Sequence, residues 1–388
     1  MKKAVLINKD GAKSIDEFDS AKLERQPLED TVKMILKDKA PDYTEIEVSF
    51  FQLCALRCRF CWQDNDDPEG VTSIAEKAEI AIDYLEKHKD KIRPNIQVHM
   101  LGGELFEDSN DYYDQYYDFI VDIHKYVSEN MPEKKLMFVF LTNMNFQKDS
   151  TRDKLENFLN SLRDKGIKFI LTTSWDPTGR PLKGEVTTKF HQNITYFKKD
   201  LAEITFVLTK PTIRRLLDGR TEYLDLLVKE GFKIDYDYYM PTTNVDSMMP
   251  TDRDLLNGLR MLIYRYPNIS KLKSFTHPEQ GGHLTCASLN KITILPDGTI
   301  TNCRHLDYTQ EDFETKITNE TNADIIMSFI TKRECLTCEY FEQCPMSCFV
   351  MADHKKFLEN QELDECFYKI LFRETEDERQ ANSRTSGE

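Results

Sequence analysis

The sequence predicts an α/β fold, a partial (β/α)6 barrel followed by a small C-terminal cysteine-rich domain. Between residues 45 and 240, six short runs rich in β-branched and aromatic residues alternate with helical patterns. The ten cysteines form two groups, and none lies between residues 62 and 285. From Cys286 onward, helical periodicity mostly vanishes while cysteines become dense, which is typical of a small domain held together by metal.

The six strand-like runs predict a parallel sheet, because strands separated by helices connect through right-handed crossovers. Eight such strands would make a full barrel, whereas six make an open, partial one. Chemistry in these sheets gathers at the carboxyl ends of the strands, and the motifs described below follow those ends. The runs are Glu45–Phe51, Ile96–Leu101, Leu136–Thr142, Ile167–Thr173, Ile204–Thr209 and Phe232–Tyr238.

Helical patterns lie between these runs. Apolar residues recur every three or four positions after Ser73, which forms a capping-box pattern with Glu76. Gly166 and Gly231 stand where two other patterns stop, as glycines do at helix ends. The apolar stripes are Ile74, Ala78, Ile82 and Leu85; Leu155, Phe158, Leu159 and Leu162; Phe190, Ile194 and Phe197; and Leu224, Leu227 and Val228.

Smaller features help to divide the chain. The turn Pro296-Asp297-Gly298 separates two short strand-like runs, and Leu255–Tyr264 forms a helical patch. Near the N-terminus lie a strand-like Ala4–Ile7 and a helix-like Leu28–Leu36. We therefore predict an N-terminal extension at 1–44, the barrel at 45–240, a connection at 241–285, the C-terminal domain at 286–373 and a charged, disordered tail at 374–388.

Composition narrows the possible partners and the compartment. The net charge of −15 argues against a nucleic-acid groove, which needs clustered Lys and Arg. Met1 to Asp10 contain no apolar signal core, and no stretch approaches the roughly 18 apolar residues of a membrane span. We expect a cytoplasmic protein with no membrane partner, in which thiols stay reduced and ligate metal rather than form disulfides.

Cys54, Cys58 and Cys61 follow directly after the first strand. Three thiolates with this spacing can hold one 4Fe-4S cluster and leave its fourth iron without a protein ligand. An open metal position is what a catalytic site needs. Zinc is the competing metal, but a structural zinc site takes four protein ligands, and His88 and His99 lie on other predicted elements.

This cysteine loop after the first strand resembles the signature of the radical SAM superfamily, and the resemblance extends over about residues 45 to 240. It implies that S-adenosylmethionine (AdoMet) binds the open iron and is cleaved reductively to the 5′-deoxyadenosyl radical. Phe60 matches the aromatic residue that lies near the adenine in this family, although packing within the loop is the plain alternative.

Further motifs stand at later strand ends. Gly102, Gly103 and Glu104 match the family's GGE motif, which holds the methionine amino group; without the resemblance they read as a turn. Asn143 and Ser174 match positions that contact the ribose or carboxylate of the cofactor. Many relatives have a glycine after the residue matching Asp176, whereas this chain has a proline. Asp176 is therefore a weak catalytic candidate, and shaping the loop is the role that we favour.

Seven cysteines in the C-terminal domain resemble the SPASM domain, an iron–sulfur domain that binds two auxiliary 4Fe-4S clusters. The resemblance implies three 4Fe-4S clusters in all, together with AdoMet. Zinc ligation remains an alternative, since paired cysteines also suit zinc. By resemblance, Cys335, Cys338, Cys344 and Cys366 bind an outer cluster, whereas Cys286, Cys303 and Cys348 bind an inner one whose fourth iron is open or ligated by His283.

Three functions are compatible with these motifs. The first is radical modification of a peptide, such as crosslink formation in a ribosomally made natural-product precursor, as in many SPASM relatives. The second is protein oxidation of the sulfatase-maturing type or dehydrogenation of a small molecule. Sulfatase-maturing relatives have Asp after the cysteine matching Cys303, whereas this chain has Arg304, itself a weak catalytic candidate. The third is a non-enzymatic zinc scaffold.

The expected partners follow from the first function. They are a peptide or protein substrate and an electron donor such as flavodoxin or ferredoxin. The 44 residues before Glu45 are too few for the leader-binding domain of about 80 residues found in peptide-modifying relatives. Leader recognition would then need a separate protein or another surface.

Overall fold

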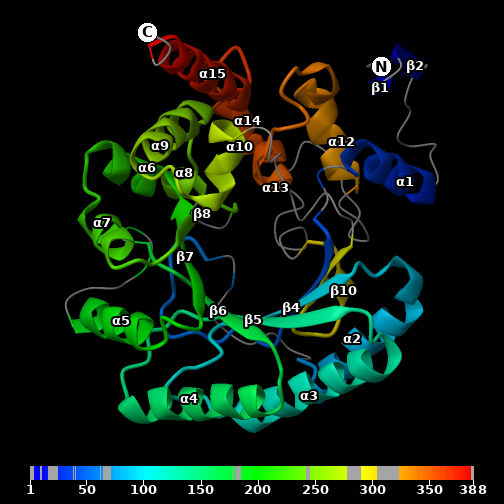
Figure 1. Ribbon diagram of the computed structural model, residues 1–388, viewed down its shortest axis with the longest axis vertical. Coiled ribbons are helices and arrows are strands. Elements are labelled where there is room, and N and C mark those ends of the chain that lie inside the picture. Colours follow the sequence, from blue (N-terminus) through cyan, green and yellow to red (C-terminus); the bar gives the residue numbers. More distant parts are fainter. Residues whose placement is uncertain are drawn as a thin grey trace.

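The structure is a computed structural model, whose main feature is one eight-stranded sheet (Figure 1). It describes residues 4–8, 11–15, 25–37, 39, 41–61, 63, 71–176, 178, 180, 185–241, 245–277, 290–303 and 323–385. The strand order is β10-β9-β3-β4-β5-β6-β7-β8, and all neighbouring pairs are parallel except β10 with β9. The sheet comprises β3 (Tyr43–Ser49), β4 (Asn95–Leu101), β5 (Lys135–Leu141), β6 (Phe169–Ser174), β7 (Leu201–Leu208), β8 (Ile234–Tyr238), β9 (Lys291–Ile294) and β10 (Ile300–Thr301).

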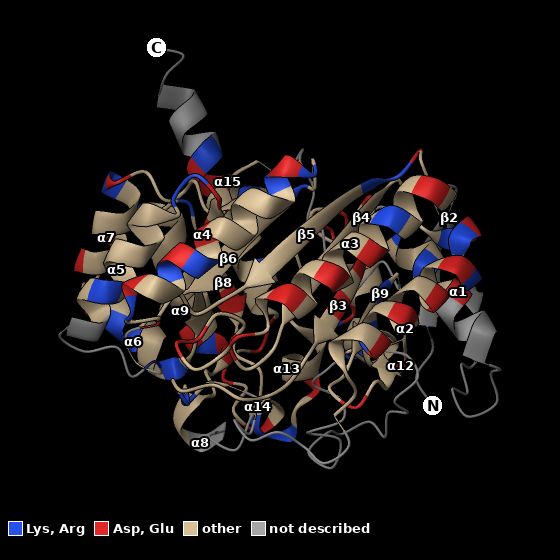
Figure 2. Cartoon of the chain, turned by 90° about the horizontal axis from the view of Figure 1, so that it is seen from below, with Lys and Arg blue, Asp and Glu red and all other residues tan. Residues whose placement is uncertain are grey.

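The six strands predicted from the sequence are β3 to β8, and their parallel order confirms the partial barrel. Helices cover the outer face of the sheet (Figure 1), and acidic and basic residues are interspersed along them (Figure 2). The capping box of Ser73 and Glu76 opens the first of them. Between the strands lie α2 (Ile74–Lys87), η1 (Lys89–Lys91), α3 (Tyr113–Asn130), α4 (Asp149–Asp164), α5 (Glu185–Tyr196), α6 (Lys210–Leu217) and α7 (Glu222–Lys229).

The sheet alternates between two environments along each strand, as period-two geometry requires. On β3, Ile46 and Val48 belong to the apolar core, whereas Glu45 and Glu47 form ion pairs with Lys291 on β9. The polar face is therefore the inner face of the partial barrel, and it is the face on which a ligand cavity can form.

Strands β9 and β10 belong to the segment that we assigned to the C-terminal domain, yet they extend the barrel sheet. The Pro296-Asp297-Gly298 turn joins them, with Gly298 at φ 85°. Lys77 of α2 donates to the Pro296 carbonyl at 2.7 Å and so ties the hairpin to the barrel. Local patterns predicted the hairpin but not its partner strand, because the register of a distant strand is not a local property.

The loss of helical periodicity expected after Cys286 is a point on which the sequence analysis was wrong. Helix α12 has one broad, buried apolar face, a helical pattern that the sequence analysis overlooked. Helices α12 (Ala323–Lys332), α13 (Phe349–Asp353), α14 (Lys355–Glu359) and α15 (Phe367–Thr385) follow, together with η6 (Cys335–Thr337).

The prediction of a disordered tail from residue 374 is also wrong, because α15 continues to Thr385. Glu374 forms an ion pair with Arg260 of α9, and Tyr340 donates to Glu376 at 3.2 Å. These partners come from distant segments, so the charged sequence alone does not predict them. The connection after β8 contains α8 (Val245–Met248), α9 (Asp252–Arg265), η2 (Ser270–Leu272) and α10 (Lys273–Thr276).

The N-terminal extension contains the hairpin β1 (Ala4–Asn8) with β2 (Gly11–Ile15), followed by α1 (Arg25–Leu36). Helix α1 lies beside α12 (Figure 1), and its Val32 and Leu36 are buried. Within the described residues, no helix is long and apolar enough to cross a membrane.

Candidate functional site

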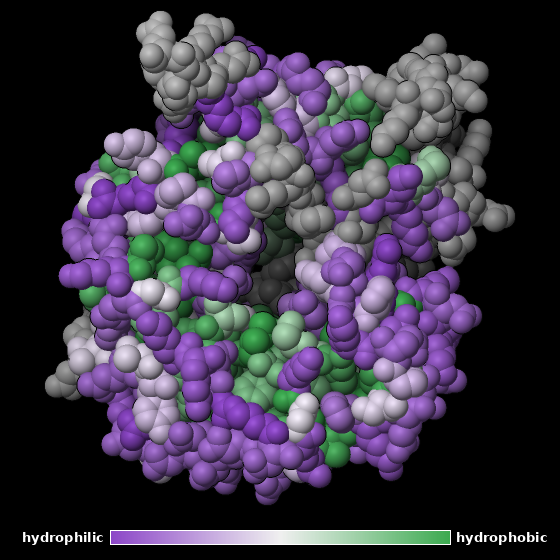
Figure 3. Space-filling view, viewed as in Figure 1, coloured by the Kyte–Doolittle hydropathy of each residue, from purple (hydrophilic) through white to green (hydrophobic). Residues whose placement is uncertain are grey.

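A cavity of about 830 Å³ lies at the carboxyl ends of the strands and extends along the inner face of the barrel. Figure 3 shows the molecule hollowed near the centre of the face seen in Figure 1. Most of the cofactor-site residues predicted from the sequence line this one cavity. They are Cys54, Cys58, Phe60, Cys61, Gly102, Gly103, Glu104, Asn143 and Ser174, which come from the ends of four successive strands, β3 to β6.

The cysteine loop after β3 is held in place by the glycine loop after β4. Glu104 N donates to Leu53 O at 2.9 Å, directly before the first cysteine. A Cβ atom on Gly103 would lie 1.6 Å from Leu53 O, so the two backbones approach more closely than any side chain permits. Gln63 adds a side-chain bond to Gly102 O at 2.9 Å. The glycines therefore serve the packing of two loops against each other.

The Glu104 carboxylate is buried and accepts three hydrogen bonds. Its partners are Phe106 N at 3.0 Å, Thr142 Oγ1 at 2.6 Å and Asn143 N at 2.5 Å. Burial raises the pKa of Glu104 to about 7, against the opposing effect of these hydrogen bonds. A positively charged amine in the cavity would favour the carboxylate form, so the site is suited to binding one.

This burial predicts a pH dependence of stability. The pKa of Glu104 in the folded protein lies at about 7, above the ordinary value of 4.5. The protonated carboxyl therefore stabilises the folded state fully below pH 4.5, and this stabilisation is lost as the pH rises through about 7. The difference corresponds to on the order of 3 kcal/mol in the free energy of unfolding. We expect Glu104→Gln to remove this dependence, measured as the difference between wild-type and variant denaturation midpoints at pH 5.5 and 8. Parallel curves for the two proteins would contradict the assignment.

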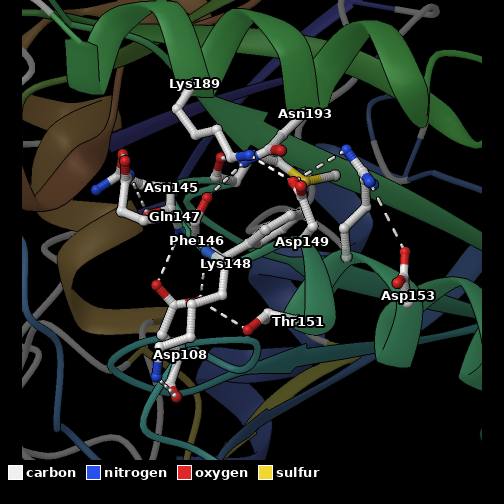
Figure 4. Close-up of polar contacts among 12 residues, drawn as sticks. Asp108, Asn145, Phe146, Gln147, Lys148, Asp149, Thr151, Asp153, Lys189 and Asn193 are labelled. Carbon is white, nitrogen blue, oxygen red and sulfur yellow. Dashed lines mark hydrogen bonds and ion pairs between the residues drawn. The ribbon is translucent and has the colours of Figure 1, made fainter.

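The loop after β5 presents Asn143 to the cavity. The residues that follow it in this loop are held from both sides (Figure 4). Asp108, four residues beyond Glu104, accepts from Gln147 N at 2.8 Å and Thr151 Oγ1 at 2.6 Å. From α5, Asn193 donates to the carbonyls of Met144 and Phe146 at 3.0 and 2.9 Å. The Asn143 amide in turn reaches Cys54 Sγ at 3.8 Å. The three loops after β3, β4 and β5 therefore form one connected unit.

At the end of β6, Ser174 lines the cavity but Asp176 does not. Asp176 is buried and accepts from Thr178 Oγ1 and Thr212 Oγ1, each at 2.8 Å. These bonds join the loop to the start of α6, which is the loop-shaping role favoured in the sequence analysis. The hydrogen bonds of Asp176 thus lie within its own loop and at the start of α6.

Arg180 is a cavity residue that the sequence analysis missed. It is buried, and its Nη2 donates to Asn143 O at 3.3 Å, while among the described residues its Nε and Nη1 meet no acceptor. Burial raises the pKa of Cys58, and the Arg180 guanidinium opposes that shift. A buried guanidinium with open donors fits a carboxylate ligand. The only sequence signal was an arginine six residues after Ser174.

A second group of thiols lines the same cavity from the C-terminal segment. Cys303 follows β10, and Cys348 is the N-cap residue of α13. The Cys348 Sγ lies 3.3 Å from the sulfur of Met240. The cavity therefore has thiols on two sides. The other predicted members of this region, Cys286, His283 and Arg304, lie outside the described residues.

Four further thiols form an outer group that does not line the cavity. Electrostatic effects link Cys335 with the other three, which places all four near one another. Burial raises the pKa of Cys344 to about 12. The group comprises Cys335, Cys338, Cys344 and Cys366, each partly buried.

The donor chemistry of these groups fits iron–sulfur clusters. Burial also raises the pKa of Cys54 to about 12, so thiolates form in such surroundings when a bound cation compensates their charge. Partly buried, sulfur-only sets select soft metals and iron–sulfur clusters. Among the described residues, no three Cys, His, Asp or Glu side chains converge closely enough to hold a single metal ion.

The inner face of the barrel carries charges that the sequence analysis did not foresee. Lys291 lies 2.6 Å from Glu45 and 3.4 Å from Glu47, and Thr293 donates to Glu47 at 3.0 Å. Near the other edge of the sheet, Lys271 pairs with Asp237 of β8, and both residues line the same cavity. A packed barrel interior is normally filled by bulky apolar side chains, so this charged lining indicates a solvated space for a polar ligand.

Comparison with known proteins bears on the fold. The sequence matches no protein-family model and no curated protein. The structure is similar to a histidine-tagged form of anSMEcpe with bound AdoMet (TM-score 0.59, 16% identity, 88% of this chain and 95% of that chain). It is also similar to native anSMEcpe with bound AdoMet (TM-score 0.55, 15% identity, 87% and 98%) and to Streptococcus suis SuiB bound to S-adenosylmethionine (TM-score 0.48, 16% identity, 89% and 83%).

The two anSMEcpe structures match nearly their whole length. The chain therefore shares the overall fold of these AdoMet-bound proteins. This confirms the fold expected from the cysteine loop and from the strand order. At such low identity the likeness concerns the fold, and the chemistry is argued from the residues of the cavity.

Proposed function

We propose that this protein is a radical SAM enzyme that cleaves AdoMet reductively to the 5′-deoxyadenosyl radical and uses it to modify a peptide. The observation that carries the proposal is the single cavity that joins the three-cysteine loop, the Gly-Gly-Glu loop, Asn143 and Ser174. These groups come from four separate strand ends, and together they offer thiols, a buried carboxylate and polar side chains to one ligand.

Each residue then has a defined task toward AdoMet. Cys54, Cys58 and Cys61 hold the cluster, which when bound supplies the electron that breaks the sulfonium bond. Glu104 accepts the cofactor's amine, and the open donors of Arg180 face its carboxylate. Asn143 and Ser174 offer polar contacts to the ribose, and Phe60 packs on the adenine.

The C-terminal cysteines complete the proposal. Cys303 and Cys348 line the cavity and belong to the inner auxiliary cluster with Cys286, and the outer four thiols hold the second. The proposed enzyme is an oxidoreductase that receives electrons from a donor such as flavodoxin or ferredoxin. Its peptide leader is recognised by another surface of this chain or by a separate protein. The proposed domain division is that of the sequence analysis up to residue 373, with β9 and β10 now shared with the barrel sheet and α15 continuing the C-terminal domain to Thr385.

The peptide class rests on the resemblance to SPASM maturases and agrees with the charged lining of the cavity. Glu47, Asp237 and Lys271 offer polar partners along the inner face of the barrel. Protein oxidation of the sulfatase-maturing type and dehydrogenation of a small molecule remain as alternatives that share the first half of the reaction. The experiment must therefore test cofactor cleavage and substrate class separately.

The test uses anaerobically purified, iron-reconstituted protein with AdoMet and a reductant. We expect release of 5′-deoxyadenosine, detected by mass spectrometry, and four-iron clusters by iron analysis and electron paramagnetic resonance. With a deuterated peptide encoded by a neighbouring gene, deuterium should appear in 5′-deoxyadenosine. A zinc-only protein without cleavage overturns the enzyme proposal. Cleavage with label transfer from a deuterated sugar alcohol but from no peptide overturns the peptide class alone.

A further inference from the structure

Lys39 is a buried lysine in the segment between α1 and β3, and only 3% of its surface is exposed. Its Nζ donates to Cys344 O at 2.8 Å and to Glu342 O at 3.1 Å. The same ammonium lies 5.1 Å from the centre of the Phe341 ring. All three partners belong to the loop that carries Cys338 and Cys344, more than 300 residues away in the chain.

A buried ammonium is costly unless nearby negative charge compensates it. The two carbonyls and the ring each contribute partial negative charge. The helix before Lys39 is anchored by the buried Val32 and Leu36 against α12, which directly precedes the cysteine loop. The N-terminal segment therefore brings a fixed positive charge to the outer group of thiols.

A cluster at that group would place full negative charge beside this ammonium. A 4Fe-4S cluster held by four thiolates is net negative and gains one more negative charge on reduction, and its reduction potential depends on nearby charge, hydrogen bonding and solvent exposure. A fixed cation beside it favours the reduced form. Arg333 also acts to lower the pKa of Cys335, but its effect is the smallest of those given for that thiol.

We propose that Lys39 is part of the outer-cluster site, as the counter-charge that raises the reduction potential of the cluster held by Cys335, Cys338, Cys344 and Cys366. This inference rests on the proposed function, because it requires an iron–sulfur cluster at those four thiols. It gives the N-terminal extension a role in electron transfer. Lys39 is a positioning residue and does not touch the substrate.

The test is a redox titration of the reconstituted full-length chain carrying Cys54→Ala, Cys58→Ala and Cys61→Ala, monitored by electron paramagnetic resonance. In this background only the auxiliary clusters give signals. We expect Lys39→Met to lower the potential of one auxiliary cluster, with about a tenfold smaller ratio of reduced to oxidised cluster at a fixed potential, which is about 59 mV for one electron. Lys37→Met removes the same charge from an exposed position of the same segment and should change nothing.

Further variants separate charge from packing. Lys39→Arg keeps the charge and should keep the potential, whereas Lys39→Gln keeps a donor without the charge and should behave like Lys39→Met. If both neutral variants lose four irons per chain while Lys39→Arg retains them, the counter-charge is required for assembly and the proposal stands. An unchanged potential in Lys39→Met, or equal loss of iron in Lys39→Arg, overturns it. Absence of auxiliary signals from the parent chain would instead contradict the proposed function.

Discussion

Replacing Cys54, Cys58 and Cys61 with alanine is expected to abolish formation of 5′-deoxyadenosine while leaving iron at the C-terminal thiols. The three cysteines follow β3 and line the same cavity as Glu104 and Asn143, the other parts of the proposed AdoMet site. Without these thiols no iron–sulfur cluster can bind in the loop after β3, so no electron can reach the sulfonium group of AdoMet. The measurements are 5′-deoxyadenosine by mass spectrometry and iron per chain.

The matched control for this triple variant is Arg59→Ala in the same loop. Arg59 is exposed, contacts Ser247 Oγ at 3.3 Å and does not line the cavity. We expect it to keep the full iron content and to cleave AdoMet. Cleavage of the cofactor by the triple variant under reducing conditions would show that the radical chemistry resides elsewhere. Loss of all iron in the triple variant would mean that the two groups of thiols do not assemble independently.

The parts of the site that sequence could predict are those in which one short motif follows one strand. The cysteine loop after β3, Gly102-Gly103-Glu104 after β4 and Asn143 after β5 were each placed at a strand end. Parallel strands bring their carboxyl ends to one edge of the sheet. Predicting the strands correctly was therefore enough to predict that these residues lie together.

The residues that sequence could not place depend on pairs of segments far apart in the chain. Lys291 reaches the inner face because β9 pairs with β3, and Lys39 meets the outer thiols through a contact between residues 305 positions apart. Arg180 is buried in the cavity although the segment around it has no strand or helix pattern. Neither local propensity nor periodicity contains information of this kind.

The helices missed after Cys286 have a different cause. In α12, the buried Ile325, Ile326, Met327, Phe329 and Ile330 form one broad apolar face. This is a 3.6-residue pattern that the sequence contained and that the dense cysteines around it obscured. In α15 the pattern stops at Phe372, and the ordered continuation depends on Arg260 and Tyr340. The C-terminal half of α15 therefore depends on tertiary contacts.

The glycine loop gives the sharpest mutational expectation outside the thiols. In Gly103→Ala, the new Cβ would lie 1.6 Å from Leu53 O, 2.1 Å from Leu53 C and 2.4 Å from Gln52 O. These are backbone atoms, so no side-chain rotation can relieve the overlap, and the cysteine loop must separate from the glycine loop. The Glu104 N to Leu53 O bond of 2.9 Å would be lost with it. We expect destabilisation of about 3 kcal/mol or more, with fewer irons per chain and no cleavage of AdoMet.

Two other glycines provide graded controls for Gly103→Ala. At Gly102 a Cβ meets the Phe51 ring at 3.0 Å, which is a side chain that can shift, so Gly102→Ala should cost less. At Gly258 of α9 the nearest atoms are side-chain carbons of Ile213 at 3.2 Å, and alanine is favoured in a helix by about 1 kcal/mol. Urea denaturation and iron analysis should therefore rank the variants Gly258→Ala, Gly102→Ala and Gly103→Ala in order of increasing damage. A Gly103→Ala protein with wild-type stability and a full complement of iron would show that the two loops do not depend on this contact, and the connected unit of β3, β4 and β5 loops would have to be abandoned.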